Sequence, residues 1–355
     1  MTNIKKTDVK DDLLAAAGWG DAAIFPLAGD ASTRRYERLE RAGKTAILMI
    51  APPGAEAPCC PKNADEATRI SLGYNAMARL AGPNLHAFVA LADALNKAGL
   101  SAPSVLAADA ANGFALLEDL GDDLFARVVG AIEEETLYRA AIDALVRLHK
   151  TPLSPVENDH YSMLDYDHLA LETETQLLID WYWPLKHGEA ANIDICTEYK
   201  SMWSEVLTGL SVPNTFVLRD YHAENLLWLP KREGAAKVGV IDFQDALYGH
   251  AAYDIVSLLE DARRDVDPAL AAQMIAYYQD QVPGDKAQFD RDYAILAAQR
   301  NAKILGIFAR LAKRDNKPAY LNLLPRVEAH FGRDLERPAL APLRPFFEKH
   351  FPGLA

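Results

Sequence analysis

One stretch of the chain, residues 218–245, constrains the fold more than any other. It begins LRDYHAENLLWL, continues through the polar segment PKREGAA and ends with KVGVIDFQD. Residues 216–218 predict a short strand entering a loop, and residues 226–229 and 237–241 predict two strands joined by a turn that contains Pro and Gly. In such a hairpin the start of the first strand lies beside the end of the second, so Asn225 and Asp242 become neighbours.

The polar groups of this stretch suit a divalent metal and an attacking hydroxyl. Directly opposed strand residues have Cβ atoms roughly 4.5–5.5 Å apart, so Asn225 and Asp242 can reach one Mg²⁺ at oxygen distances of about 2.0–2.1 Å. Asp220, in the preceding loop, can then face a nucleophile. Phosphoryl transfer needs these parts, a metal to neutralise phosphate charge and a carboxylate to orient and deprotonate the hydroxyl. The alternative, that the three residues only form turns and cap a strand, is disfavoured because all three occur together between strand signals.

Composition indicates a globular chain with more than one folding unit. Its 355 residues are 50% hydrophobic, a length that suggests two domains or lobes. The formal net charge of −13 opposes non-specific binding of nucleic acid. No apolar run reaches the ~20 residues of a membrane helix, and the three cysteines, two of them adjacent, favour a reducing compartment. We expect a cytoplasmic protein with no membrane or nucleic-acid partner and no obligate protein partner.

The secondary-structure signals change from mostly strands to mostly helices near residue 118. The predicted class is therefore α+β, with a small β-rich lobe over 1–117, a connector at 118–121 and a larger, mainly helical lobe over 122–355. The expected strands are 24–39, 44–50, 103–107 and 114–117, and the expected helices are 66–80, 86–98, 133–150, 166–180, 252–264, 268–281 and 288–313.

These motifs resemble those of the aminoglycoside phosphotransferase family, which has a two-lobed, protein-kinase-like fold. The spacing from Asp220 to Asn225 matches the family's catalytic loop, Asp242 stands at its metal-binding Asp, and DALYGHAAYDIVSLL at 245–259 is similar to its next motif. The resemblance implies an ATP-dependent kinase in which Asp220 is the catalytic base and Asn225 and Asp242 hold Mg²⁺. Asp254, within the last motif, is expected with His250 to brace the two loops.

The resemblance also implies where the nucleotide binds. GDASTRR, residues 29–35, occupies the position of the family's phosphate-covering loop, so Ser32 and Thr33 are expected to contact phosphate oxygens. In kinase-like folds the connector bonds the adenine edge through its main chain, which makes Glu118 and Leu120 candidates. A charged surface connector without this role would have the same sequence.

One position departs from the kinase pattern. Kinase-like proteins carry a lysine on the third strand, paired with an acid on the following helix, but Met49 stands there and Asp93 is the nearest acid. We expect Arg34 or Arg35 to supply the missing cation, because arginine binds phosphate in bidentate fashion. Lys44, near a turn, is a weaker candidate.

A subfamily of bacterial cell-wall-recycling kinases is similar along most of the chain. Its members phosphorylate the anomeric hydroxyl of N-acetylmuramate and N-acetylglucosamine. The similar segments are GDASTRRYERL, the exit Ala51-Pro52-Pro53, GFALLEDLGD, LRDYHAENLLWL, IDFQDALYGHAAYD and QRNAKILGIFARL. This resemblance implies transfer of the γ-phosphoryl of ATP to such a sugar in peptidoglycan recycling.

The acceptor sugar is expected near Asp220. His222, Glu224 and Gln244 lie within the catalytic loops, where a sugar hydroxyl or N-acetyl group can meet them. Trp181 begins an aromatic run that suits the apolar face of a pyranose, although a corner of the core is the favoured interpretation. A solvated helix face is likewise favoured over contact with a lactyl carboxylate for the polar run of Arg300, Asn301 and Lys303.

Two other functions remain open at this point. One is another small-molecule kinase of the same fold, acting on an aminoglycoside, a choline-like alcohol or another sugar. The other is a nucleotide-binding regulator without transfer activity, motivated by Met49. A protein kinase is disfavoured because no long activation loop follows Asp245.

Overall fold

The computed structural model of the chain describes residues 6–27, 33–55, 57–82, 84–152 and 154–354. Contacts divide the chain into two compact units: unit 1 comprises Met1–Leu164 and Ala223–Ala246, and unit 2 comprises Asp165–His222 and Leu247–Ala355. Both strands and helices are present, as the α+β prediction requires. None of the helices in the described ranges combines the length and hydropathy that a membrane span needs.

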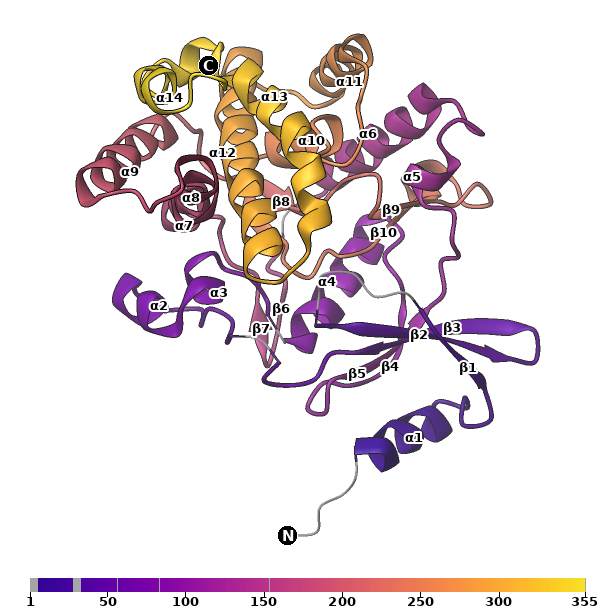
Figure 1. Ribbon diagram of the computed structural model, residues 1–355. Coiled ribbons are helices and arrows are strands. Elements are labelled where there is room, and N and C mark those ends of the chain that lie inside the picture. Colours follow the sequence, from indigo (N-terminus) through magenta and orange to yellow (C-terminus); the bar gives the residue numbers. More distant parts are fainter. Residues whose placement is uncertain (1–5, 28–32, 56, 83, 153, 355) are drawn as a thin grey trace. The chain divides into compact units, whose positions relative to one another are not determined.

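Unit 1 is built on a five-stranded antiparallel sheet with strand order β1-β2-β3-β5-β4 (Figure 1). The two-residue turn Ala42-Gly43 joins β2 to β3, and both residues have positive φ, 49° and 74°, as such a hairpin turn requires. The single strand predicted over 24–39 is instead divided into β1 and β2. The strands are β1 Ala23–Pro26, β2 Arg35–Arg41, β3 Lys44–Ile50, β4 Val105–Asp109 and β5 Phe114–Glu118.

The two faces of this sheet have different partners. Successive side chains of a strand point to opposite faces. Leu39 and Leu48 share a buried cluster with Leu14 of α1 (Lys6–Ala16), so they face this helix. Met49 points to the opposite face and is paired directly with Tyr36. Figure 1 shows α1 on one side of the sheet and α4 on the other.

Helices and a second hairpin complete unit 1. The hairpin of β9 (Leu226–Trp228) and β10 (Val238–Val240) is antiparallel, as predicted, and α6 packs against its turn. The helix predicted over 66–80 is interrupted at Gly73, which has a φ of 90°. The other elements are α2 Glu66–Leu72, α3 Tyr74–Met77, α4 Leu85–Ala98, α5 Phe125–Val128, α6 Glu134–Lys150, β6 Glu157–Asn158, β7 Tyr161–Ser162 and the 3-10 turn η2 Gly234–Lys237.

The predicted lobes and the two compact units divide the chain differently. The prediction assigned all of 122–355 to one helical lobe, from the change between strand and helix patterns. In the contacts, α6 and the β9–β10 hairpin group with the sheet in unit 1. The lobe boundaries remain a prediction, whereas the two units are defined by which residues pack together.

Unit 2 is organised around the long helix α12 (Lys286–Lys313), which contacts α7, α10 and α13. A Cβ on Gly306 would lie 2.3 Å from the carbonyl of Leu177, so α12 and α7 approach closely because this residue has no side chain. Strand β8 (Thr215–Val217) pairs with β11 (Leu247–Gly249), a short strand that was not predicted. The other elements are α7 His168–Leu177, the π-helix η1 Leu178–Tyr182, α8 Trp183–His187, α9 Ile193–Leu207, α10 Ala252–Leu259, α11 Pro268–Gln281, η3 Pro318–Leu323, α13 Leu324–Leu335, η4 Pro338–Leu340 and α14 Arg344–His350.

Candidate active site

In unit 1 the β9–β10 hairpin places Asn225 and Asp242 at one end. The N–H of Ile241 donates to the carbonyl of Asn225 at 3.0 Å, so the pairing continues past β10 to the residue before Asp242. Asp242 has a φ of 59°, a left-handed conformation that is uncommon outside glycine. Such outliers cluster at functional sites, and the carboxylate of Asp242 is 44% exposed. The predicted metal pair therefore shares one end of one hairpin.

Two polar side chains lie next to the Asp242 carboxylate. The Nε2 atom of Gln244 donates to its Oδ1 at 2.8 Å, and Arg34 Nη1 lies 3.9 Å from the same oxygen. The Nη2 atom of Arg34 donates to the carbonyl of Gly82 at 3.0 Å. Burial raises the pKa of Tyr36 to about 12, while the charge of Arg34 lowers it and that of Asp242 raises it. Arg34, Tyr36 and Asp242 thus form one electrostatic group.

The segment after β10 is fastened to the rest of unit 1. Phe243 is fully buried and stacks on Phe88 of α4, with ring centroids 4.8 Å apart. The Oδ1 atom of Asp245 accepts from the N–H of Ala81 at 2.6 Å. These contacts fix the backbone on the side of Asp242 that leads away from the hairpin.

The structure separates the two arginines proposed to replace the strand lysine. Met49 is fully buried in β3. Asp93 is ion-paired with Lys97 at 2.6 Å on the exposed side of α4, so it is no partner for a cation on β3. Arg35 is exposed, and by strand alternation it belongs to the face that carries α1, whereas Arg34 lies beside Asp242.

The predicted nucleotide contacts are only partly described. Ser32 lies outside the described residues, and Thr33 is exposed. The N–H of Glu118 donates to the carbonyl of Ser104 at 2.8 Å, so this main-chain donor is already used within the sheet.

The connector is fastened to the sheet around Leu120. Arg38 of β2 is ion-paired with Asp119 and Asp122, each at 2.8 Å. The hydrogen bonds that Arg38 donates, and then its charge, lower the pKa of Asp122. These ion pairs hold the chain on both sides of Leu120 against β2.

In unit 2 the loop that carries Asp220 is held from α10. The N–H groups of Leu218 and Arg219 donate to the fully buried carboxylate of Asp254 at 2.7 and 2.9 Å. Burial raises the pKa of Asp254 to about 7 although both hydrogen bonds oppose the shift. Asp254 therefore braces this loop, as expected. His250 instead contacts Ser211, with 3.3 Å between its Nδ1 and the hydroxyl oxygen.

Positive charge surrounds the carboxylate of Asp220, which is 38% exposed. Arg300 Nη2 lies 4.0 Å from its Oδ1. Exclusion of water by the surrounding protein raises the pKa of Asp220, but the charges of Lys303, then Arg300, His222 and Arg219, outweigh this and leave the pKa below its ordinary value. Asp220 is therefore ionised at neutral pH and can accept a hydrogen bond from a hydroxyl.

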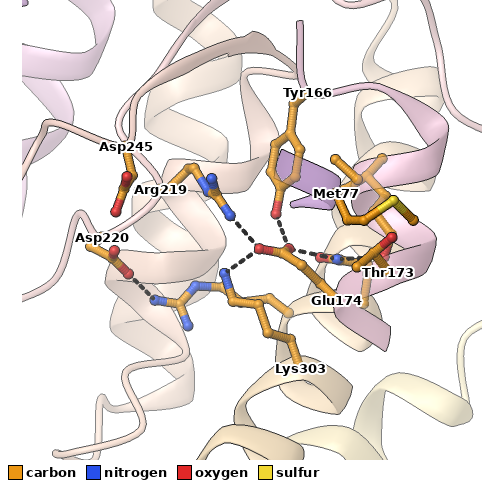
Figure 2. Close-up of polar contacts among 12 residues, drawn as sticks. Met77, Tyr166, Thr173, Glu174, Arg219, Asp220, Asp245 and Lys303 are labelled. Carbon is orange, nitrogen blue, oxygen red and sulfur yellow. Dashed lines mark hydrogen bonds and ion pairs between the residues drawn. The ribbon is translucent and has the colours of Figure 1, made fainter. Parts of the chain in front are cut away.

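Two of the cations near Asp220, Arg219 and Lys303, belong to a buried network centred on Glu174 of α7 (Figure 2). The Glu174 carboxylate accepts hydrogen bonds from Tyr166 and Arg219 and pairs with Lys303 at 3.3 Å. Burial raises the pKa of Glu174, yet the charges of Lys303 and Arg219 outweigh burial and leave the pKa below its ordinary value. The carboxylate is therefore the counter-charge for two buried cations.

The interpretation of Arg300, Asn301 and Lys303 as a solvated helix face is wrong, because all three are buried in the middle of α12. Apolar residues flank this polar run on both sides in a helix of 28 residues. That pattern is typical of a central helix, and it is the signal that could have indicated burial. Nothing local in the sequence singled out Glu174.

The predicted sugar contacts lie in different surroundings. His222 is 6% exposed, and burial, with the charge of Arg263, lowers its pKa to about 4, so the imidazole is neutral at pH 7. Glu224 is exposed and Gln244 is buried beside Asp242. Trp181 is partly exposed in η1. The next two residues of its aromatic run are buried, so the run is mainly a corner of the core.

Residues 24–291 match the model of a family described as the phosphotransferase enzyme family. The chain belongs to this family. The match includes Asp220, Asn225 and Asp242, and it ends before the polar run of α12.

Within this family, one relative is similar to the chain along nearly its whole length. A phosphotransferase of Caulobacter vibrioides, named N-acetylmuramate/N-acetylglucosamine kinase, is 44% identical over 349 residues, which cover 97% of this chain and 96% of the relative. Among solved structures, a choline kinase from Streptococcus pneumoniae matches with a TM-score of 0.60 and 13% identity over 92% of this chain and 99% of its own. An ADP-bound aminoglycoside phosphotransferase matches with a TM-score of 0.52 and 14% identity over 90% and 96%. These structural likenesses concern the fold, and the predicted protein-kinase-like class is confirmed.

Proposed function

We propose that this phosphotransferase transfers the γ-phosphoryl of ATP to the anomeric hydroxyl of N-acetylmuramate or N-acetylglucosamine. The observation that carries the proposal is the 44% identity to the Caulobacter kinase along nearly the whole of both chains. The candidate residues for metal binding and proton transfer, Asn225, Asp242 and Asp220, are all present. ADP in a structural neighbour supports an adenine nucleotide as the donor.

In this proposal Asn225 and Asp242 hold Mg²⁺ together with the nucleotide phosphates. Oxygen ligands and few protein side chains are typical of Mg²⁺ bound to a nucleotide. Bound there, the metal would neutralise charge on the phosphates. Thr33 and the main chain of Glu118 and Leu120 remain the proposed nucleotide contacts.

Asp220 acts on the acceptor. Its ionised carboxylate accepts the proton of the anomeric hydroxyl while the sugar oxygen bonds to the γ-phosphorus and the bond to ADP breaks. The anomeric hydroxyl is more acidic than an ordinary alcohol, so it demands less basicity of the carboxylate. This suits a group whose pKa is held low by neighbouring cations. Trp181 and Glu224 stay candidates for the rest of the sugar.

An acceptor panel tests the substrate. ADP release is measured with free N-acetylmuramate and N-acetylglucosamine, with their methyl glycosides, and with choline and an aminoglycoside. We expect release with the free sugars alone, since methylation removes the reacting hydroxyl. Release with choline or the aminoglycoside and none with the sugars would establish the other kinase function. Nucleotide binding without release for any acceptor would favour the silent regulator.

A second test concerns the cation that replaces the strand lysine, for which we propose Arg34. Arg34→Ala should weaken binding of Mg-ADP and raise the KM for ATP about 10–100-fold, because a hydrogen bond to a charged group contributes roughly 1.5–3 kcal/mol. Isothermal titration with Mg-ADP measures the affinity directly. Arg35→Ala is the matched control, since this arginine is exposed on the α1 face of β2. Equal effects of the two substitutions would contradict the assignment.

A further inference from the structure

Among the described residues of unit 2, three buried cationic side chains lie around the loop that carries Asp220. They are Arg219, Arg300 and Lys303, with side chains 2%, 5% and 8% exposed. Glu174 pairs with both Arg219 and Lys303. Arg300 is different, because its described ion pair is with Asp220.

Arg300 is fixed in place by α10. Its Nη2 atom donates to the hydroxyl of Ser257 at 2.6 Å, and this hydroxyl donates to the carbonyl of Arg219 at 3.3 Å. The guanidinium carbon also lies 6.0 Å from the ring centroid of Tyr253. Arg300 is thus anchored both to α10 and to the backbone immediately before Asp220.

The separation of 4.0 Å between Arg300 and Asp220 makes the contact an ion pair and not a hydrogen bond. Arg300 can therefore influence the charge of Asp220 without donating a hydrogen bond to it. Among the described residues, the other charged or titratable groups that act on this carboxylate include Lys303 from α12, Arg219 and His222 from its own loop, and Asp254 from α10. His222 is neutral at pH 7, and Lys303 and Arg219 share Glu174.

We propose that Arg300 is a positioning residue that keeps the Asp220 carboxylate charged while the acceptor hydroxyl binds. The inference rests on the proposed function, in which Asp220 is the base. A nearby cation favours the ionised form of a carboxyl group, so removing it raises the pKa of that group. Turnover that needs ionised Asp220 is then lost as the pH falls, and the loss begins at a higher pH than in the wild type.

The experiment compares Arg300→Gln, Arg300→Lys and the control Arg291→Gln, which removes an exposed arginine of the same helix. The pH profile of kcat/KM for the sugar is measured for each variant. For Arg300→Gln we expect the acid limb of the pH profile to move to higher pH by about 1 unit. Arg300→Lys should keep the limb near its wild-type position because the charge is retained. Arg291→Gln should match the wild type, and Mg-ADP affinity should be unchanged in all three.

Two results would overturn the inference. One is an acid limb in Arg300→Gln that coincides with that of Arg291→Gln. The other is an equal loss of activity at every pH in Arg300→Gln and Arg300→Lys, which indicates a structural role alone. If Arg300→Gln does not fold, Ser257→Ala replaces it. Loss of the hydroxyl that anchors Arg300 should move the acid limb of the pH profile in the same direction, but by a smaller amount. A wild-type protein that phosphorylates no sugar would refute the proposed function itself.

Discussion

Asp220→Asn is expected to lose most turnover while the protein stays folded and binds Mg-ADP as the wild type does. The amide has nearly the same shape, but it cannot accept the proton of the acceptor hydroxyl. Loss of a positioned general base typically costs about 10²–10⁴-fold in rate. Asp254, whose pKa the charge of Asp220 helps to raise, should ionise more readily in the variant and preserve the brace on the loop. Single-turnover kinetics with saturating ATP and sugar measure the chemical step directly.

The matched control for this substitution is Asp194→Asn, which changes an exposed carboxylate near the start of α9. Its rate should equal that of the wild type. The base assignment fails if Asp220→Asn retains turnover within about tenfold of the control while binding the nucleotide equally well. Weaker Mg-ADP binding in Asp220→Asn would instead indicate that this carboxylate belongs to the metal site.

Glu174→Gln should cause the largest loss of stability of any single change considered. The substitution keeps the size of the side chain but leaves Arg219 and Lys303 buried without their shared counter-charge. Breaking a buried ion pair from one side costs about 3–5 kcal/mol. For a unit of this size such a loss lowers Tm by roughly 6–20 °C. Differential scanning calorimetry measures the change, and Glu189→Gln, at an exposed position, is the control.

A double variant distinguishes charge imbalance from lost packing. Lys303→Met removes one of the two cations and retains an apolar chain of similar length. If uncompensated charge is the cause, Glu174→Gln with Lys303→Met should be more stable than Glu174→Gln alone. Strictly additive losses would mean that the two side chains are not energetically coupled. In that case, hydrogen exchange should show that the loss of stability lies outside α7 and α12.

Much of the local structure was predictable because it depends on short-range patterns. The β9–β10 hairpin follows from two apolar runs around a turn rich in polar residues, and it fixes the backbones of Asn225 and Ile241 side by side. The bounds of α4 and α11 follow from helical periodicity and from Gly99 and Pro268 at their ends. The missing strand lysine was also visible, because Met49 stands in an otherwise regular strand. Each of these inferences needed only neighbours in the sequence or across one hairpin.

The predictions failed at breaks within expected elements and where long-range packing buried polar residues. The strand predicted over 24–39 is two strands, and the helix predicted over 66–80 stops at Gly73. The polar run of α12 was assigned to solvent because three polar residues together ordinarily lie at a surface. In the structure, distant carboxylates pair with Asn301 and Lys303, and the hydroxyl of Ser257 accepts from Arg300, which makes the burial of these residues tolerable.

The sequence by itself determined which chemical groups are present near one turn: the amide and acid of a metal pair, and a carboxylate five residues before that amide. Tertiary structure decided which cations act on them. Arg34 and Arg35 are adjacent in the chain, but Arg35 begins β2 on its α1 face, whereas Arg34 precedes the strand and lies beside Asp242. Arg300 is 80 positions from Asp220, and helix packing places it 4.0 Å from that carboxylate. Electrostatic effects depend on distance in space and on exclusion of water, and neither quantity is fixed by separation along the chain.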